Sequence, residues 1–517
     1  MIQNPVLQGF HPDPSMICVD GTFYIANSTF EYFPGVEISA SKDLANFTMV
    51  SRPLDSLAAL DMRGNYTASG IWAPNLTYKD GTYYLVFTDV KTCAVPPFKD
   101  TPNYITTTTD IENGSWTEPK FVNASGFDPS LFHDSDGRLY FLNMQVDFRL
   151  PGVKQFSGIL LTELNPTTFA PISEPINICK GSHFGVTEGP NLYKRGEYYY
   201  LFLAEGGTGY GHATTVARSK SIAGPYEFHP DVAVVTSVHD DKYPLQKAGH
   251  SAICDGPDGR SFIASLASRP LANMRCPLGR ETVISELVWK EDDWCYLKSG
   301  KQTPDLTFTG YGEQREETSF TYKFDTDECL PLLSTLRQPA QYEIAEGKLR
   351  LFGGMSPYSA FSQNMFMRKQ TDFDFDCSTE LTLCGNHFQK FAGLMHRYNE
   401  KTFFYAILTY DEVQKCKIVQ TMFVDHGKMT LGKSVAVATD TVQFKTVVRG
   451  KKGQFYYSTN GKKWHKLGKS YDASKLSDDY SDPGGFTGAH VGIACSDLQD
   501  YSAYADFTFL QYTVALK

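Results

Sequence analysis

Residues Val19-Asp20-Gly21-Thr22-Phe23-Tyr24 place an Asp-Gly pair between residues that favour extended backbone. Such a pair is a strong signal for a β-hairpin, because the tight turns of hairpins need positive φ at their central positions. The same arrangement, a turn glycine followed by aromatic strand residues, occurs five times at intervals of about 60 residues, which indicates a repeat architecture. The five turn glycines are Gly21, Gly81, Gly137, Gly196 and Gly259.

A unit of this length holds several strands, and five such units fit the blades of a β-propeller better than the coils of a solenoid. Helical periodicity is nearly absent from this part of the chain. Further along, alternating strands such as Lys348–Phe352 are separated by turns such as Asn460-Gly461. We therefore predict an all-β protein, with a five-bladed β-propeller at residues 1–310 followed by a C-terminal β-sandwich at residues 318–517.

The composition is that of an ordinary soluble chain with more than one domain. The protein has 517 residues, a hydrophobic fraction of 41%, an aromatic fraction of 14% and a formal charge of −10. The acidic balance and the absence of long basic runs exclude a typical nucleic-acid partner. We also expect no membrane partner, because no apolar stretch is long enough to span a bilayer.

The cysteines and the start of the chain bear on the compartment. The 11 cysteines are odd in number and form no Cys-x-x-Cys pair, which favours reduced thiols over a zinc site or a disulfide framework. The opening residues Met1–Pro5 lack the basic start and apolar core of a secretory signal peptide. These features predict a cytoplasmic protein.

A short segment containing Pro or Gly lies upstream of each turn glycine, and each segment carries a polar residue at a similar distance from that glycine. If these segments are the innermost strands of the blades, their polar side chains converge on the propeller axis. Three of the five are carboxylates. The five residues are Asp13, Asn75, Asp128, Glu188 and His250.

Three carboxylates in one pocket indicate acid–base chemistry. A single Asp-Pro-Ser is more often a turn or cap, but packing like charges together is costly and is typical of functional sites. Two carboxyls are the equipment of glycoside hydrolysis, where one protonates the leaving oxygen and the other activates water, and a third can tune the acid. The longer Glu188 suits the general acid, whereas either aspartate could be the base.

Several other side chains are candidates for binding a sugar, and Asn75 of the second axial segment and Phe486 are among them. Trp72, three residues before Asn75, is expected at the pocket wall, since aromatic faces cover the apolar side of a pyranose; a blade-packing Trp is the alternative. Phe30 and Phe33 lie in a Pro-Gly loop and are candidates too, although core burial is the commoner fate of Phe. Arg63 is a weaker candidate, with a solvated arginine as the alternative.

The chain resembles the β-xylosidases and α-L-arabinofuranosidases of glycoside hydrolase family 43, closely in the N-terminal three fifths and less specifically over the rest. The matching stretches are Asn4–Ser15, Ser28–Gly35, Gly70–Pro74, Gly126–Phe132, Thr187–Pro190, Ala204–Tyr210 and Cys276–Thr282. The resemblance implies that Asp13 is the general base, Asp128 the modulator of pKa and Glu188 the general acid. It also implies inversion in a single displacement, for which acid and base carboxyls lie about 6.5–9.5 Å apart, and chemistry that requires no cofactor.

The resemblance assigns further roles. Arg280 matches an arginine that hydrogen-bonds the terminal sugar, with a surface ion pair to Glu281 as the alternative. His250 matches a histidine beneath the active site, which in some members helps to hold a calcium ion or water in the central channel. Calcium prefers oxygen ligands, so a single imidazole is a weak candidate. In the second domain, Asp325 and Asp506 are candidate calcium ligands, with exposed strand-end aspartates as the alternative.

The late loop Asp482–Gly492, which includes Phe486, resembles one that reaches the active-site rim in family members. Three positions depart from the family pattern: Tyr32 stands where a Trp is usual, His490 where a Phe is common, and Asn75 where we expect a His. We expect these departures to affect rim shape and substrate preference, and to leave the acid–base chemistry intact.

The prediction for function is an inverting exo-glycosidase that removes β-1,4-linked xylose from the non-reducing ends of xylo-oligosaccharides. A mainly α-L-arabinofuranosidase activity on arabinosyl substrates is the nearest alternative, because the two sugars present similar hydroxyls. A carbohydrate-binding propeller without catalysis is the alternative from another class. The resemblance further implies a homo-oligomer, a dimer or tetramer.

Overall fold

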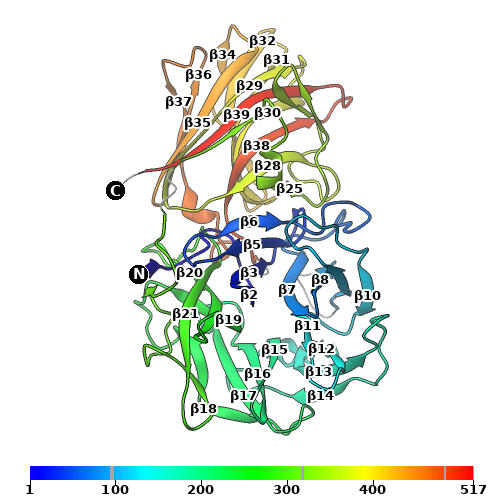
Figure 1. The fold of residues 1–517 in the computed structure, drawn as a ribbon. Coiled ribbons are helices and arrows are strands. Elements are labelled where there is room, and N and C mark those ends of the chain that lie inside the picture. Colours follow the sequence, from blue (N-terminus) through cyan, green and yellow to red (C-terminus); the bar gives the residue numbers. More distant parts are fainter. Residues whose placement is uncertain (93–97, 316–318, 482–484, 516–517) are drawn as a thin grey trace.

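The computed structural model describes residues 1–92, 98–315, 319–481 and 485–515. Five sheets encircle a central axis, and a second domain of two larger sheets lies beside the first of them (Figure 1). This arrangement confirms the predicted all-β fold of a five-bladed propeller followed by a sandwich. Among the described residues, no helix is long and apolar enough to cross a membrane. The predicted sandwich start at residue 318 and residues 482–484 of the predicted rim loop lie outside the described residues.

Each blade is a four-stranded antiparallel sheet built from strands that follow one another along the chain, with the first strand innermost. Blade 1 consists of β2 (Ser15–Val19), β3 (Thr22–Asn27), β5 (Glu37–Ser41) and β6 (Thr48–Ser51). Blade 2 consists of β7 (Gly70–Lys79), β8 (Thr82–Val90), β9 (Asn103–Thr108) and β10 (Lys120–Asn123). Blade 3 consists of β11 (Ser130–His133), β12 (Leu139–Val146), β13 (Phe156–Leu164) and β14 (Ile176–Cys179).

Blade 4 consists of β15 (Glu188–Arg195), β16 (Tyr198–Glu205), β17 (Ala213–Ser219) and β18 (Glu227–Thr236). Blade 5 consists of β19 (Gln246–Asp255), β20 (Ser261–Ser268), β21 (Glu281–Trp289) and β22 (Cys295–Leu297). The turn glycine that joins the first two strands of every blade has positive φ, as the Asp-Gly signal predicted. A Cβ at any of the five would meet no atom within 4 Å, so the backbone conformation and not crowding requires glycine there.

No blade takes a strand from another blade. The ring is closed instead by pairing between the two ends of the propeller region. Strand β1 (Ile2–Gln3) pairs with β23 (Thr307–Phe308). The buried Asn4 side chain continues this closure, since its Nδ2 donates to Ile284 O and Asp305 O, each at 2.7 Å, and its Oδ1 accepts from Ile284 N at 3.0 Å. The first residues of the chain therefore fix blade 5 against blade 1.

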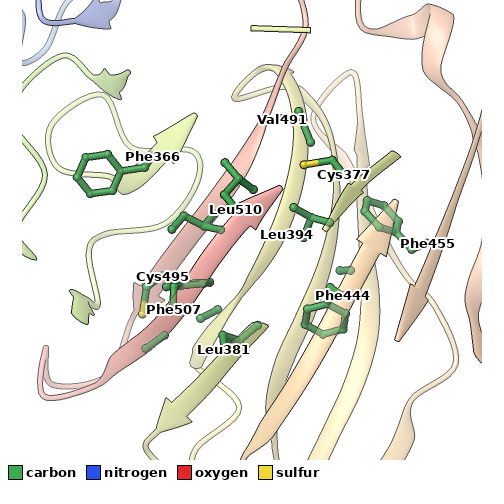
Figure 2. Close-up of a cluster of buried hydrophobic side chains, with 14 of the residues drawn as sticks. Phe366, Cys377, Leu381, Leu394, Phe444, Phe455, Val491, Cys495, Phe507 and Leu510 are labelled. Atoms are coloured by element: carbon green, nitrogen blue, oxygen red, sulfur yellow. The ribbon is translucent and has the colours of Figure 1, made fainter. Parts of the chain in front are cut away.

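The second domain packs two antiparallel sheets face to face. The first sheet contains β24 (Ser319–Lys323), β26 (Tyr342–Ala345), β27 (Lys348–Phe352), β29 (Asp374–Cys384), β35 (Thr441–Arg449), β36 (Lys452–Ser458), β37 (His465–Asp472) and β39 (Tyr504–Val514). The second contains β28 (Asn364–Lys369), β30 (Lys390–Asn399), β31 (Thr402–Asp411), β32 (Cys416–Asp425), β33 (Lys428–Leu431), β34 (Val435–Val437) and β38 (His490–Asp497). Side chains from both, such as Leu394 and Phe444, meet between the sheets (Figure 2).

The central strands β30 and β31 of the second sheet are almost entirely buried on both faces, where the two domains join. Every residue of β30 is buried, whereas β29 alternates between buried and half-exposed positions, as a strand with one covered face does. The outer face of the second sheet holds a separate apolar cluster that includes Tyr32 of the propeller. Next to it, the linker strand β25 (Thr335–Leu336) pairs with β4 (Tyr32–Phe33).

The Asn4 closure predicts a measurable loss of stability in Asn4→Ala. The substitution leaves a buried N–H and a buried carbonyl of Ile284 without partners, which costs about 1–3 kcal/mol. Urea unfolding at neutral pH measures the loss, with Asn113→Ala in an exposed loop as the matched control. Equal stability of the two variants would contradict the assigned role of Asn4.

Candidate active site

The five inner segments share an unusual backbone conformation. In each segment, one residue directly before a Pro or Ser has φ between 37° and 58°, the left-handed region that non-glycine residues seldom adopt. This residue is Asp13, Ala73, Asp128, Gly189 and His250 in blades 1 to 5. In blades 1 and 3 this residue precedes the inner strand, whereas in blades 2, 4 and 5 it lies within the strand, where the pairing register shifts.

This shared position corrects the predicted register of the axial residues. Asn75 lies two residues beyond the left-handed position of blade 2, and Glu188 lies one residue before that of blade 4. The Asn75 amide donates to Asn191 Oδ1 at 2.9 Å and accepts from Leu131 N at 3.1 Å. Asn75 therefore holds the inner strands together along the axis, and these bonds occupy the amide that was predicted to contact substrate.

The three carboxylates do come together. Asp13, Asp128 and Glu188 are 5%, 6% and 8% exposed, and each lies close enough for charge on one to shift the pKa of another. Asp128 Oδ2 accepts a hydrogen bond of 2.9 Å from Gly189 N, directly after Glu188. A side chain at Gly189 would lie 2.9 Å from Ala204 Cβ and 3.1 Å from the His250 ring, so glycine is required for this approach.

Asp13 is the carboxyl that stays ionised. Arg280 Nη1 donates to Asp13 Oδ1 at 2.8 Å, and Ser28 Oγ donates to Asp13 Oδ2 at 2.6 Å. His250 Nδ1 lies 3.8 Å from Asp13 Oδ1. Burial opposes ionisation, but Arg280, His250 and Ser28 outweigh it, so the pKa of Asp13 falls below its ordinary value.

Glu188 and Asp128 are the carboxyls that keep a proton. Burial raises the pKa of Glu188 well above its ordinary value, and the charges of Asp128 and Asp13 raise it further. The pKa of Asp128 is also raised, by burial and then by Asp13. Because the two groups are coupled, their protons belong to the pair. The site thus pairs an ionised base with a protonated acid.

An aromatic wall that contains Trp72 and Phe30 stands beside the carboxylates, and Arg280, which binds Asp13, lies over the Phe30 ring. The Trp72 ring centroid is 5.6 Å from that of Phe30 and 5.6 Å from that of Phe486, which reaches in from the second domain. Trp72 Nε1 donates to Ala68 O at 3.0 Å, which fixes the plane of the indole. Faces of this kind pack against the C–H groups of a pyranose.

Arg280 connects the base to the second domain. Besides Asp13, it donates from Nη2 to Phe486 O at 2.8 Å, and its guanidinium lies 5.2 Å from the centroid of the Phe30 ring. Its Nε is buried and has no hydrogen-bond partner among the described residues. The alternative of a surface ion pair with Glu281 is wrong, because Glu281 pairs with Arg269 at 2.7 Å.

Two predicted substrate contacts are wrong. Phe33 is 2% exposed and packs in an apolar core cluster that also holds Val36 and Ile71. It lies three residues after Phe30, where β4 turns its side chain into this core. Arg63 is exposed and forms a two-pronged ion pair with Asp61, at 2.9 and 2.6 Å. That pairing satisfies the guanidinium within its own loop.

The metal predictions also fail. Asp506 is held by Arg350 through two hydrogen bonds, at 2.8 and 3.0 Å, and Asp325 is exposed. Among the described residues, no three His, Cys, Asp or Glu side chains are grouped to hold a metal ion. His250 lies under Asp13 and borders an axial cavity of about 10 Å³, which has room for about one water molecule. These residues do not fit a calcium site.

Tyr32 and His490, two of the departures from the family pattern, contact each other. Their rings stack with centroids 3.8 Å apart and planes 18° apart, and both side chains are buried at the domain junction. The expectation that they shape the rim is wrong. They fill one shared space between the propeller and the sandwich, so each substitution accommodates the other.

Four side chains at the site were not predicted from the sequence. Ser28 binds Asp13, Phe10 and Phe127 support Phe30 and Trp72 with ring centroids 5.5 and 5.2 Å apart, and Lys99 Nζ lies 5.8 Å from the Trp72 ring centroid. The first three occur within the motifs quoted for the resemblance, which was the available signal. No sequence signal indicated Lys99, because a lysine in a loop is usually solvated.

Comparisons with known proteins found relatives that match almost the whole chain. The chain is 41% identical to the "Xylosidase/arabinosidase 43B" of Humicola insolens, over 99% of this chain and 97% of that one, and 39% identical to the "Beta-xylosidase" of Bacillus subtilis (strain 168), over 99% of both. The crystal structure of xylan beta-1,4-xylosidase from Bacillus halodurans C-125 superposes with a TM-score of 0.96 at 40% identity, over 99% of this chain and 100% of that one.

Family models match both domains. The model "Beta xylosidase C-terminal Concanavalin A-like domain" matches residues 321–513, and the model "Glycosyl hydrolases family 43" matches residues 2–295. The second match covers more than half of the chain and contains all three site carboxylates. The chain therefore belongs to glycosyl hydrolases family 43.

Proposed function

We propose that this chain is an inverting exo-glycosidase that removes β-1,4-linked xylose from the non-reducing ends of xylo-oligosaccharides. The observation that carries the proposal is the opposite protonation of two buried carboxyls: the pKa of Asp13 is lowered and that of Glu188 is raised. Hydrolysis with inversion needs one ionised base and one protonated acid in the same pocket. The names of the relatives, xylosidase and xylosidase/arabinosidase, support xylose as the sugar removed.

The geometry assigns each group a step. Asp13 accepts a proton from a water molecule as that water attacks the anomeric carbon, on the face opposite the leaving group. Glu188 donates its proton to the glycosidic oxygen as the bond to the anomeric carbon breaks. Burial and the charge of Asp13 keep Glu188 in its neutral form until that step, and Asp128, held by Gly189 N, raises the pKa of Glu188 further when it is ionised. No cofactor takes part in these proton transfers.

The burial of the site supports exo action. All three carboxyls are under 10% exposed, and Phe486 of the second domain, whose carbonyl accepts a hydrogen bond from Arg280 of the propeller, closes the pocket. A chain end can enter such a pocket, whereas the middle of a polysaccharide needs an open cleft. One terminal sugar would lie against Trp72, with its linkage oxygen at Glu188.

A mainly α-L-arabinofuranosidase activity is the second candidate, because three relatives carry arabinosidase or arabinofuranosidase in their names. Steady-state hydrolysis of 4-nitrophenyl β-D-xyloside and of 4-nitrophenyl α-L-arabinofuranoside decides between them. We expect the higher kcat/KM for the xyloside. A higher value for the arabinofuranoside would favour the second candidate, and sugar binding without turnover would favour a non-catalytic propeller.

The family resemblance also supports a homo-oligomer of two or four chains. Light scattering coupled to gel filtration measures this directly, and a mass of 57.8 kDa would identify a monomer.

The opposite pKa shifts predict a bell-shaped pH dependence of kcat/KM. The pKa of Asp13 is lowered, so activity is lost on acidification only below the ordinary aspartate value of 3.8. The pKa of Glu188 is raised, so the alkaline loss lies well above the ordinary glutamate value of 4.5. Initial rates on xylobiose between pH 3 and 10 test both limbs. An acidic limb centred above 3.8 would contradict the Asp13–Arg280 pairing.

The loss of activity in Glu188→Gln should depend on how strongly the leaving group needs protonation. We expect kcat/KM for xylobiose to fall roughly 10²- to 10⁴-fold, because its leaving alcohol needs protonation, and to fall far less for 2,4-dinitrophenyl β-xyloside. The matched control is Glu286→Gln, which removes a carboxylate that pairs with Lys298. Equal losses on both substrates would show that Glu188 is not the acid.

A further inference from the structure

A loop of blade 2 leaves its sheet beside the aromatic wall. Trp72 pairs with Thr88 across β7 and β8, so the chain that follows Val90 emerges at the end of the blade where Trp72 lies. Further along that loop, Lys99 Nζ lies 5.8 Å from the centroid of the Trp72 ring. The described part of the loop, residues 98–102, therefore borders the pocket.

A loop of blade 3 emerges at the same end. Met144 N donates to Phe127 O at 3.0 Å, so β12 ends beside the segment that carries Asp128. The loop that follows, residues 147–155, leads into Phe156, whose ring centroid is 5.9 Å from that of Phe127. Phe127 in turn contacts Trp72. The two loops thus flank one side of the pocket mouth.

The tips of these loops carry an exposed aromatic pair. Phe98 is 63% exposed and Phe148 is 55% exposed, and their ring centroids lie 5.2 Å apart. Leu150 and Val153 of the second loop are exposed next to them in sequence, at 38% and 66%. Exposed apolar side chains that are gathered at the mouth of a pocket indicate a binding surface more than a packing need.

The pair lies on the side where the leaving group departs. Burial and the charges of Asp128 and Asp13 raise the pKa of Glu188, and the neighbouring Lys99 is close enough to act against them. The loop of Phe98 and Lys99 therefore approaches the group that protonates the leaving oxygen. Arg280 and Phe486 bond to each other deeper in the site, beside Asp13, whereas Phe98 and Phe148 are exposed.

We propose that Phe98 and Phe148 form an aromatic platform for the second sugar unit on the leaving-group side of the cleaved bond. The inference rests on the proposed exo-xylosidase function and names a part of the substrate that the carboxylate site does not reach. A xylopyranose stacks on such faces through its C–H groups. Xylobiose fills only the terminal position and the first leaving-group position, so xylotriose is the shortest substrate that touches the platform.

The test compares xylotriose with xylobiose in Phe148→Ala and in the double variant with Phe98→Ala. We expect kcat/KM for xylotriose to fall about tenfold, as the loss of one stacked ring predicts, and that for xylobiose to stay unchanged. Phe148→Tyr should retain the wild-type ratio because it keeps a ring. The matched control is Phe121→Ala on β10, where the ring is 59% exposed beside Tyr104 and away from the two loops.

Equal effects on both substrates, or no effect on either, would overturn the platform. A changed mass of the double variant in light scattering would do the same, since the pair would then be a contact between subunits. Calorimetric binding of both oligosaccharides to Glu188→Gln gives a readout without turnover. If the wild type cleaves no xyloside, the proposed function fails; the platform fails separately if Phe148→Ala leaves the affinity of that variant for xylotriose unchanged.

Discussion

The site depends on which of its three buried carboxyls pairs with the one positive charge of Arg280. Arg280 could neutralise any of them, but its Nη1 lies 2.8 Å from Asp13 Oδ1. Asp13 is therefore ionised, while Glu188 and Asp128, which are buried beside that negative charge, retain a proton. Base and acid are distinguished by the position of a single guanidinium, and the rest of the fold keeps that guanidinium in place.

The second domain helps to hold Arg280 against Asp13. Phe486 O accepts the other hydrogen bond of Arg280, and the Phe486 ring packs on Trp72. Nearby, Asp479 accepts from Lys247 Nζ at 2.6 Å and from Cys276 N at 2.9 Å, which fastens the same segment of the sandwich to blade 5. The sandwich is thus a wall of the catalytic pocket. Strand β30 of its second sheet is buried on both faces, because one face packs in the core of the sandwich and the other packs against the propeller.

Local chemistry made the blades and the carboxylates predictable. An Asp-Gly turn can be recognised from its own two residues, because it depends only on local backbone conformation. Five turn glycines at regular intervals along the chain therefore predicted the propeller. Asp13 and Asp128 were found because both occupy the left-handed position of their blades, and Glu188 because it lies one residue from it. Asn75 was wrongly matched to these positions because the left-handed residue of blade 2 is Ala73, whose methyl side chain has no polar group that would indicate a site.

The remaining errors concern partners that are distant in the sequence. Phe30 and Phe33 are equivalent as sequence, and only the pairing of β4 with the linker strand turns the second into the core. Tyr32 and His490 looked like two separate losses of a rim aromatic, but they stack on each other. Asp506 resembled a metal ligand until Arg350, more than 150 residues earlier, was found against it.

The central claim, that Asp13 activates water while Glu188 protonates the leaving oxygen in one displacement, is tested most directly by the anomer of the released sugar. Proton NMR of xylobiose hydrolysis, followed from the first minutes, separates α-xylose from β-xylose before mutarotation mixes them. The account predicts that α-xylose appears first. Initial β-xylose would mean retention through a covalent intermediate, and would contradict the roles given to Asp13 and Glu188.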